Sequence, residues 1–329
     1  MNILVTGGAG YIGSHVSLNL LNAGYNVTIL DDLSNGYEQL IPQKADFIKC
    51  NISDVETINS LLQNKKFIAI MHFAGLIKAE ESVKFPEKYF TNNSKNSEQL
   101  FNICFQNNLS NIIFSSSAAI YGNALHADLI PETAELRPLN PYGESKIKTE
   151  KFLLKQNSKD INFIILRYFN VAGADPLMRS GLISKEPTHL IKIASEAAIG
   201  KRDKVIIFGK DYDTHDGTAV RDYIHVSDLA EIHVKSLEYL LKNKQSKIFN
   251  CGYGKGYSVK EVIDEINKIC NNKINIEYGP RRLGDAISLI SDITKLKQHI
   301  DWMPKYNNLN FILNTAIKWE LKLKNDKIF

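Results

Sequence analysis

The sequence predicts an α/β fold, with a doubly wound parallel sheet and a smaller carboxyl-terminal α/β lobe. Over roughly the first 170 residues, short β-branched apolar runs alternate with longer helical patterns, which is typical of stacked βαβ units. After about residue 175 the pattern becomes irregular, and loop-rich stretches separate shorter elements. We therefore expect one domain at residues 1–175 and a second at 176–329, with segments of the second returning to the first.

Six strands are expected in the first domain, and helical patterns separate them. In chain order they are NILVT (2–6), NVTIL (26–30), DFIK (46–49), FIAIMHF (67–73), NIIFSSS (111–117) and NFIILRY (162–168). A helix is expected at 141–154, where Pro141 suits a first turn. The stretch 223–241 also has helical periodicity and is a candidate for a return to the first domain.

Composition argues against several functional classes. Hydrophobic residues make up 44% of the 329 residues, which is enough for an ordinary globular core. The net charge of +4 comes from 40 basic and 36 acidic residues spread along the chain, so no block suggests a nucleic-acid or membrane surface.

The four cysteines, at 50, 104, 251 and 270, lie far apart and form no CxxC pair. This spacing argues against a zinc site or a disulfide framework and predicts buried free thiols. Because the chain starts directly with MNILVTGG and no apolar run is long enough to span a membrane, we expect a cytoplasmic protein.

A glycine-rich turn, VTGGAGYIGSH, follows the first strand and opens the first helix. Gly7, Gly10 and Gly13 recur at three-residue intervals, and Gly8 completes a GxGxxG pattern. Glycines here let the backbone turn tightly and approach a pyrophosphate, while the helix amino terminus offers free N–H groups. The pattern favours a Rossmann-type dinucleotide site, and the alternative is a glycine-rich βα turn that binds nothing.

The second strand ends at LDDLS, which places Asp31 about 20 residues beyond the glycines. A carboxylate there can accept hydrogen bonds from an adenosine ribose 2′-hydroxyl. Asp31 and its neighbour Asp32 would repel a 2′-phosphate, so NAD is favoured over NADP. The alternative is that Asp31 only caps a turn.

PYGESK, residues 141–146, places Tyr142 and Lys146 one helical turn apart on the same face. Lowering a phenol pKa from about 10 to near 7 requires roughly 4 kcal/mol of preferential stabilisation of the phenolate. A lysine at about 6 Å supplies roughly 3 kcal/mol at an effective dielectric near 20, and an oxidised nicotinamide ring can supply the remainder. The pair therefore predicts a general base beside NAD, whereas without a dinucleotide site it would be a solvated surface pair.

A run of three serines, Ser115 to Ser117, ends the strand at 111–117. Strand carboxyl ends face the ligand crevice in doubly wound sheets, so one hydroxyl can hydrogen-bond a sugar oxygen and the phenol. Spacing does not say which serine, and a polar strand end without a catalytic role is the alternative.

Eight motifs, in order GGAGYIGSH, HFAG, ESVKFPEKYFTNN, FSSSAAIYG, PYGESK, LRYFN, VRDYIHVSDLA and PRRLGD, give the chain a wider resemblance. It resembles the UDP-glucose (UDP-galactose) 4-epimerases of the extended short-chain dehydrogenase/reductases over nearly its whole length. The resemblance implies a bound NAD that is not consumed, a 4-keto sugar intermediate that turns over while UDP holds it, and inversion at C4. It also implies a homodimer, with segments at about 83–107 and 142–157 at the interface.

The resemblance also assigns residues to roles. The catalytic serine, base and lysine fall on Ser117, Tyr142 and Lys146. The cofactor contacts fall on Gly7, Gly10, Tyr11, Ile12, Asp31, Asp32, Asn51, Phe73, Asn92, Lys146 and Tyr168. The UDP-sugar contacts fall on Ser117, Tyr142, Asn170, His189, Arg221, Tyr223, Arg282 and Leu289, and the arginines suit a pyrophosphate by their bidentate geometry.

The chain departs from the family pattern at three places. Asn51 replaces an acidic adenine contact, and Ile77 with Lys78 replaces a lysine after FAGL, which puts that pyrophosphate contact in doubt. Leu289 replaces a bulky tyrosine, so a 2-acetamido group can fit and UDP-GlcNAc/UDP-GalNAc become candidate substrates, unless the leucine simply fills the pocket.

The alternatives are another nucleotide-sugar enzyme, such as a dehydratase or a decarboxylase, a net reductase, and a catalytically silent NAD-binding sensor or scaffold. A nucleotide-sugar dehydratase needs further proton carriers where this chain has Ala118 and Ala119, and Asp31 disfavours the NADPH of a net reductase. A catalytically silent NAD-binding sensor would not need to retain Tyr142 and Lys146 together.

Overall fold

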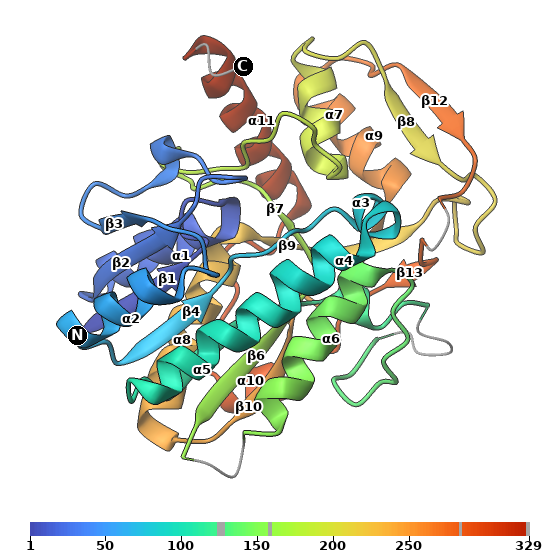
Figure 1. The fold of residues 1–329 in the computed structure, drawn as a ribbon. Helices are drawn as coiled ribbons and strands as arrows, with labels where there is room; N and C mark the ends of the chain where they lie inside the picture. Colours follow the sequence, from blue (N-terminus) through green and yellow to red (C-terminus); the bar gives the residue numbers. More distant parts are fainter. Residues whose placement is uncertain (124–128, 157–159, 283–284, 327–329) are drawn as a thin grey trace.

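A seven-stranded parallel sheet forms the centre of the molecule, with helices on both faces (Figure 1). The computed structural model describes residues 1–123, 129–156, 160–282 and 285–326. The strand order is β10-β6-β5-β4-β1-β2-β3, so the expected α/β class is confirmed. The strands are β1 (Asn2–Thr6), β2 (Asn26–Asp31), β3 (Asp46–Lys49), β4 (Ala69–His72), β5 (Asn111–Ser117), β6 (Asn162–Tyr168) and β10 (Lys247–Cys251).

Two separate apolar clusters bury the two faces of this sheet. Along β1, Ile3 and Val5 join the cluster that contains α1 and α8, whereas Leu4 joins the cluster beneath the opposite helices. This alternation follows from the two-residue period of a strand. One face carries α1 (Tyr11–Asn22) and α8 (Val226–Asn243), and the other carries α2 (Val55–Asn64), α5 (Asn96–Gln106) and α6 (Pro141–Leu154).

Several short helical elements lie between the longer ones. They are η1 (Glu38–Leu40), α3 (Ala79–Lys84), α4 (Pro86–Tyr89), the π-helix η2 (Phe90–Lys95), η3 (Ala118–Ile120) and α10 (Thr294–His299). Of these, α3, α4 and η2 lead directly into α5, and η3 follows directly after β5, so both groups lie beside the carboxyl ends of the strands.

The remaining elements form a smaller lobe, and its strands β8 (Val205–Phe208) and β12 (Ile276–Gly279) are drawn at the upper right of Figure 1. These two strands pair in parallel, and β9 (Val220–His225) pairs with β7 (Asn170–Ala172), β11 (Gly256–Ser258) and β13 (Ser288–Leu289). Helices α7 (Leu190–Ala198), α9 (Val259–Cys270) and α11 (Leu309–Asn325) pack against one another.

The expected strands match the structure closely, but the expected helix at 223–241 was wrong at its start. Residues 223–225 belong to β9, and α8 begins at Val226 because the His225 side chain accepts a hydrogen bond from Ser227 N at 3.1 Å. The seventh strand, β10, was not expected, and it pairs in parallel with β6.

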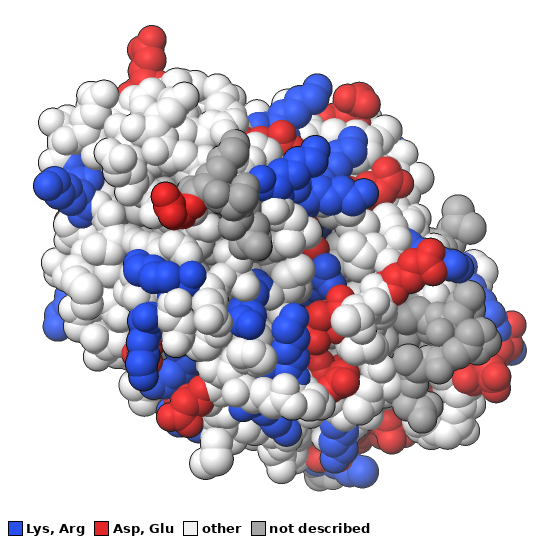
Figure 2. All heavy atoms as spheres, turned by 90° about the horizontal axis from the view of Figure 1, so that it is seen from below, with Lys and Arg blue, Asp and Glu red and all other residues white. Residues whose placement is uncertain are grey.

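The surface carries both signs of charge. In Figure 2, Lys and Arg side chains lie interleaved with Asp and Glu, so the face shown presents no broad field of one sign. Among the described residues, no helix combines the length and the apolar character needed to cross a membrane. The four cysteines are free thiols, three of them buried and Cys270 half-buried.

Four buried histidines make stability sensitive to acid. Burial lowers the pKa of His15 and His233 to about 4 and that of His72 and His225 to about 3. An unfolded histidine titrates near 6.5, so the stability that these neutral rings contribute is complete above pH 6.5 and is lost as pH falls toward 3. We expect the free energy of unfolding to fall by about 1.4 kcal/mol per pH unit for each histidine in this window. Urea unfolding at a series of pH values measures it, and a level free energy from pH 7 to pH 5 would contradict the burial of neutral rings.

Candidate active site

The carboxyl end of β5 meets the first turns of α6. Helix α6 begins here because Asn140 Oδ1 accepts a hydrogen bond from Gly143 N at 3.0 Å and Pro141 occupies the first turn. Tyr142 forms a side-chain hydrogen bond with Ser117, and Lys146 Nζ donates to the Ser115 carbonyl at 2.8 Å. The structure therefore brings the predicted serine, tyrosine and lysine together.

The pleat of β5 separates the three serines. Ser115 and Ser117 are half-buried, whereas Ser116 is buried and points to the opposite side, where its Oγ donates to Glu150 at 2.5 Å. The Ser115 side chain bonds to Tyr168, so Ser117 is the serine whose hydroxyl reaches the Tyr142 phenol.

The protein alone does not lower the pKa of Tyr142. Burial raises this pKa above its usual value, and the hydrogen bond from Ser117 only partly opposes that effect. Burial also lowers the pKa of Lys146 to about 8, while the Glu150 carboxylate acts in the opposite direction. The hydrogen bond to the Ser115 carbonyl holds the Lys146 ammonium in place, one helical turn from the phenol.

The glycine turn has the close contacts that a phosphate cradle needs. Gly7 has φ +73, and a Cβ there would lie 2.5 Å from Ala74 N. A Cβ on Gly13 would lie 2.2 Å from Gly7 O. The residue before α1 is Gly10, which has no side chain to cap the helix. It therefore provides no side-chain acceptor for the first-turn N–H groups of Tyr11 and Ile12. The cradle therefore fits an anionic pyrophosphate.

Three polar side chains lie together past β2 and β3. Asp31 is buried at the end of β2, where its carboxylate accepts from Ala9 N at 3.0 Å and Leu33 N at 2.9 Å. The Asn51 amide donates to Asp32 Oδ2 at 2.6 Å. This corner offers carboxylate oxygens beside the glycine turn, which fits a ribose with free hydroxyl groups.

The remaining residues assigned to the cofactor lie along the middle strands. Phe73 follows β4, and its ring lies 5.0 Å from the His233 ring. Tyr168 ends β6, and its hydroxyl is hydrogen-bonded to His233 Nε2. His233 Nδ1 lies 2.8 Å from the Leu229 carbonyl and can only donate to it, so Nε2 is the acceptor and Tyr168 donates. Asn92 lies in the π-helix η2 and donates to Asn93 Oδ1 at 3.1 Å.

The residues assigned to the UDP-sugar come from the smaller lobe and its junction with the sheet. Asn170 of β7 is paired with Tyr223 of β9, and His189 precedes α7. Burial raises the pKa of Tyr223 and lowers that of His189. Leu289 of β13 lies opposite Arg221 of β9.

Both arginines have acidic partners. Arg221 forms an ion pair with Asp285 and donates to Ala286 O at 2.7 Å. Arg282 Nε lies 3.6 Å from Glu80 of α3, and its guanidinium lies 4.0 Å from the centre of the Phe208 ring. Leu283 and Gly284, the centre of the PRRLGD motif, lie outside the described residues. The Arg282 contact joins two segments some 200 residues apart, so no local pattern could have predicted it.

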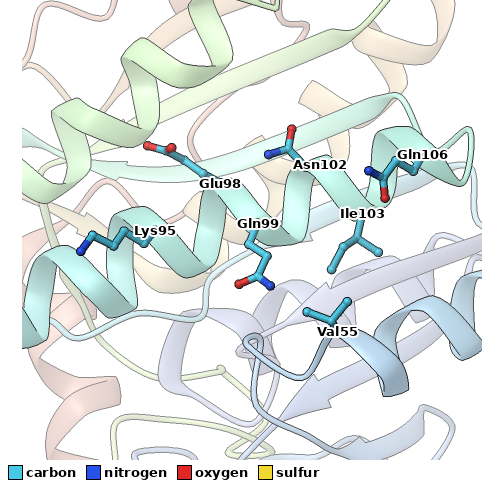
Figure 3. Close-up of a pocket in the computed structure, with 7 residues that line it drawn as sticks. All are labelled: Val55, Lys95, Glu98, Gln99, Asn102, Ile103 and Gln106. Carbon is cyan, nitrogen blue, oxygen red and sulfur yellow. The ribbon is translucent and has the colours of Figure 1, made fainter.

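A shallow hollow on the outer side of α5 is separate from this site. Figure 3 shows its lining, which is mostly polar and comes from α5, Lys95 and one residue of α2. None of the residues that face it belongs to the glycine turn, the end of β5 or the start of α6.

Comparison with known proteins identifies the relatives of this chain. The sequence model of the NAD dependent epimerase/dehydratase family matches residues 3–252. The UDP-glucose 4-epimerase of Azospirillum brasilense is 42% identical over 323 residues, covering 98% of this chain and 92% of that protein. A UDP-glucose 4-epimerase structure from Stenotrophomonas maltophila, with bound NAD and formylated UDP-arabinopyranose, superposes with a TM-score of 0.95 at 34% identity over 99% of both chains. The UDP-Glc/GlcNAc 4-epimerase from Campylobacter jejuni has a TM-score of 0.85 at 42% identity, covering 98% of this chain and 99% of that one.

Proposed function

The chain belongs to the NAD dependent epimerase/dehydratase family, and we propose that it is a UDP-hexose 4-epimerase that interconverts UDP-glucose and UDP-galactose. The observation that carries this proposal is the meeting of Ser117, Tyr142 and Lys146 at the carboxyl edge of the sheet. The likeness to UDP-glucose 4-epimerases over nearly the whole chain supports it.

The described residues fit NAD. The cradle of Gly7, Gly10 and the first turn of α1 would hold the pyrophosphate, and Asp31 would accept hydrogen bonds from the adenosine ribose. Two adjacent carboxylates, Asp31 and Asp32, disfavour the 2′-phosphate of NADP by repulsion. Further contacts would come from Tyr11, Ile12, Asn51, Phe73, Asn92, Lys146 and Tyr168.

Bound NAD supplies a reversible hydride acceptor for C4 of the sugar, so the reaction inverts that carbon with no net oxidation. Tyr142 accepts the proton of the C4 hydroxyl and later returns it, which requires its phenolate. Ser117 holds the hydroxyl against the phenol. Because burial raises the pKa of Tyr142, the phenolate needs positive charge close by, from Lys146 and from the oxidised cofactor.

Binding contacts far from the reacting carbon explain how the hexose can rotate while the substrate stays bound. Arg221 and Arg282 would bind the pyrophosphate, with Asn170, His189 and Tyr223 around the rest of the nucleotide-sugar. Binding energy from these remote groups holds the substrate while the hexose itself remains loosely held.

Leu289 sets the space available beside the sugar. Its half-buried side chain packs against the small apolar cluster that contains Ala118, Tyr121 and Phe169. Because leucine is shorter than tyrosine, we propose that a 2-acetamido group fits and that UDP-GlcNAc and UDP-GalNAc are also substrates. The similarity to a UDP-Glc/GlcNAc 4-epimerase supports this range.

The Glu80 carboxylate is expected to compete with the substrate for Arg282. Glu80→Gln should lower KM for UDP-galactose about threefold and leave kcat unchanged, because an exposed ion pair contributes up to about 1 kcal/mol. Steady-state kinetics at low ionic strength measure the effect. Glu87→Gln, the same charge change on α4, is the matched control, and an equal fall in KM in both variants would show a general charge effect instead.

We also propose a cytoplasmic homodimer. Val83, Phe85 and Leu154, all in the segments 83–107 and 142–157, have large exposed fractions of 58%, 58% and 45% that a partner could cover. Residue 157 lies outside the described residues. Free cysteines agree with a reducing compartment. Sedimentation equilibrium tests the dimer, and a monomer at micromolar concentration would refute it.

The proposed function is tested by assaying all four UDP-sugars with purified protein and no added NAD. We expect interconversion of UDP-glucose with UDP-galactose by retained cofactor, and turnover of the two N-acetyl sugars. Leu289→Tyr should abolish turnover of the N-acetyl sugars and spare the other pair. Failure with every sugar, even after NAD is added, would overturn the proposal, whereas failure with UDP-GlcNAc alone would remove only the wider range.

A further inference from the structure

A buried ion pair lies directly behind the proposed catalytic residues. Glu150 of α6 and Arg167 of β6 are 1% and 3% exposed. Arg167 Nε lies 3.1 Å from Glu150 Oε1, and Nη2 lies 2.7 Å from Oε2, so the contact is bidentate. The same guanidinium donates from Nη1 to Tyr121 OH and to Glu132 O, both at 2.9 Å. Every oxygen of the carboxylate therefore has a donor, and the charge is fixed in place.

Glu150 continues the series that Tyr142 and Lys146 begin. The three residues follow one another at four-residue intervals, so they lie along one face of α6. Each is bonded to the serine run of β5: Tyr142 to the Ser117 side chain, Lys146 to Ser115 O and Glu150 to Ser116 Oγ. Three contacts hold the helix at one position along the strand, and Glu150 is the most buried of the three residues.

The charge of Glu150 also reaches Lys146. The carboxylate raises the pKa of Lys146 against the larger lowering by burial. From β4, His72 faces the same region and is neutral, because burial lowers its pKa to about 3. Tyr142 of α6 and Tyr168 of β6 are the other titratable groups nearby, and burial raises the pKa of both, which keeps them neutral in the protein alone.

We propose that Glu150 is a positioning residue for the epimerase reaction: clamped by Ser116 and Arg167, it seats Tyr142 and Lys146 against β5 and supplies negative charge that keeps the Lys146 ammonium protonated. This inference rests on the proposed function for its kinetic consequences.

Two variants of Glu150 distinguish the effect of its charge from the effect of its side-chain length. Glu150→Gln keeps the length and removes the charge, and we expect both limbs of the pH profile of kcat to move about one unit to lower pH. Glu150→Asp keeps the charge and loses one contact, and we expect a severalfold lower kcat with both limbs unchanged. Limbs that stay fixed in Glu150→Gln, whatever the loss of kcat, would overturn the proposal.

Glu150→Gln leaves Arg167 unpaired. If this variant does not fold for that reason, a double variant provides the test. Glu150→Gln/Arg167→Met removes both buried charges, and a buried pair can often be replaced in this way without loss of stability. Because Glu150 lies one helical turn from Lys146 and raises its pKa, we expect the same direction of shift, and an unmoved profile would again contradict the inference.

Unfolding measurements test the action of Glu150 on Lys146 independently of the proposed function. The pKa of Lys146 is about 8 in the folded state and lies below its unfolded value, so this residue makes stability rise with pH above about 8. Lys146→Met should remove the contribution of Lys146 to the rise of the free energy of unfolding with pH. In Glu150→Gln this contribution should begin about one pH unit lower. If the wild type turns over no UDP-sugar, the function fails, but this shift still decides for or against the action of Glu150 on Lys146.

Discussion

Replacing Tyr142 by phenylalanine is expected to lower kcat for UDP-galactose about 10³-fold, within the range typical of a lost general base. The phenol is the group that accepts the C4 proton, and phenylalanine in its place has no oxygen for the hydrogen bond with Ser117. Binding of NAD and UDP should be nearly unchanged, because the ring and its packing remain. Initial rates, NAD content of the purified protein and calorimetric titration with UDP measure these three quantities.

Tyr89→Phe is the matched control for this prediction. The Tyr89 ring lies 6.4 Å from the Tyr142 ring in an edge-on arrangement, and its hydroxyl donates to Glu81 Oε2 at 2.8 Å. It loses the same atom from the neighbouring ring, so we expect at most a severalfold change in kcat. If Tyr142→Phe retained a tenth or more of wild-type kcat, the phenolate would not be the base.

Gly7→Ala is expected to destabilise the protein by about 3 kcal/mol or more and to abolish retention of NAD. The new Cβ would lie 2.5 Å from Ala74 N and 2.7 Å from Phe73 C, both backbone atoms that cannot rotate away. The positive φ of +73 adds strain. Urea denaturation gives the free energy of unfolding, and absorbance after acid release gives the NAD content.

Gly24→Ala separates strain from crowding. Gly24 has φ +84, similar to that of Gly7, but a Cβ there would meet nothing within 4 Å. Only the conformational cost of about 1–2 kcal/mol should remain, and NAD retention should be normal. Equal losses of stability and cofactor in the two variants would show that the close approach at Gly7 has no role in forming the cradle.

Local patterns predicted much of the fold and the site. The buried parallel strands are continuous apolar runs, and the glycine turn, Asp31 and the Tyr142–Lys146 spacing each depend on a few neighbouring residues. Spacing alone left the serine open, because alternation says that neighbours on a strand point to opposite sides but not which side faces the ligand. That choice depends on how α6 packs on β5, which places Ser116 on Glu150 and Ser117 on Tyr142.

Long-range contacts account for most of what the sequence could not supply. Strand β10 joins the main sheet from beyond residue 240, and Glu80 meets Arg282 across the junction of the two parts of the chain. The burial of the Tyr142 phenol is another long-range effect. It raises the pKa of the phenol and depends on the surrounding packing, whereas the spacing to Lys146 is local.

We propose that C4 inverts because its own hydrogen leaves and returns within the site, while Tyr142 carries the hydroxyl proton. UDP-galactose labelled with deuterium at C4 tests it most directly, with the product analysed by nuclear magnetic resonance after turnover in ordinary water. We expect UDP-glucose that keeps its deuterium at C4. Replacement of that deuterium by hydrogen from the solvent would contradict it.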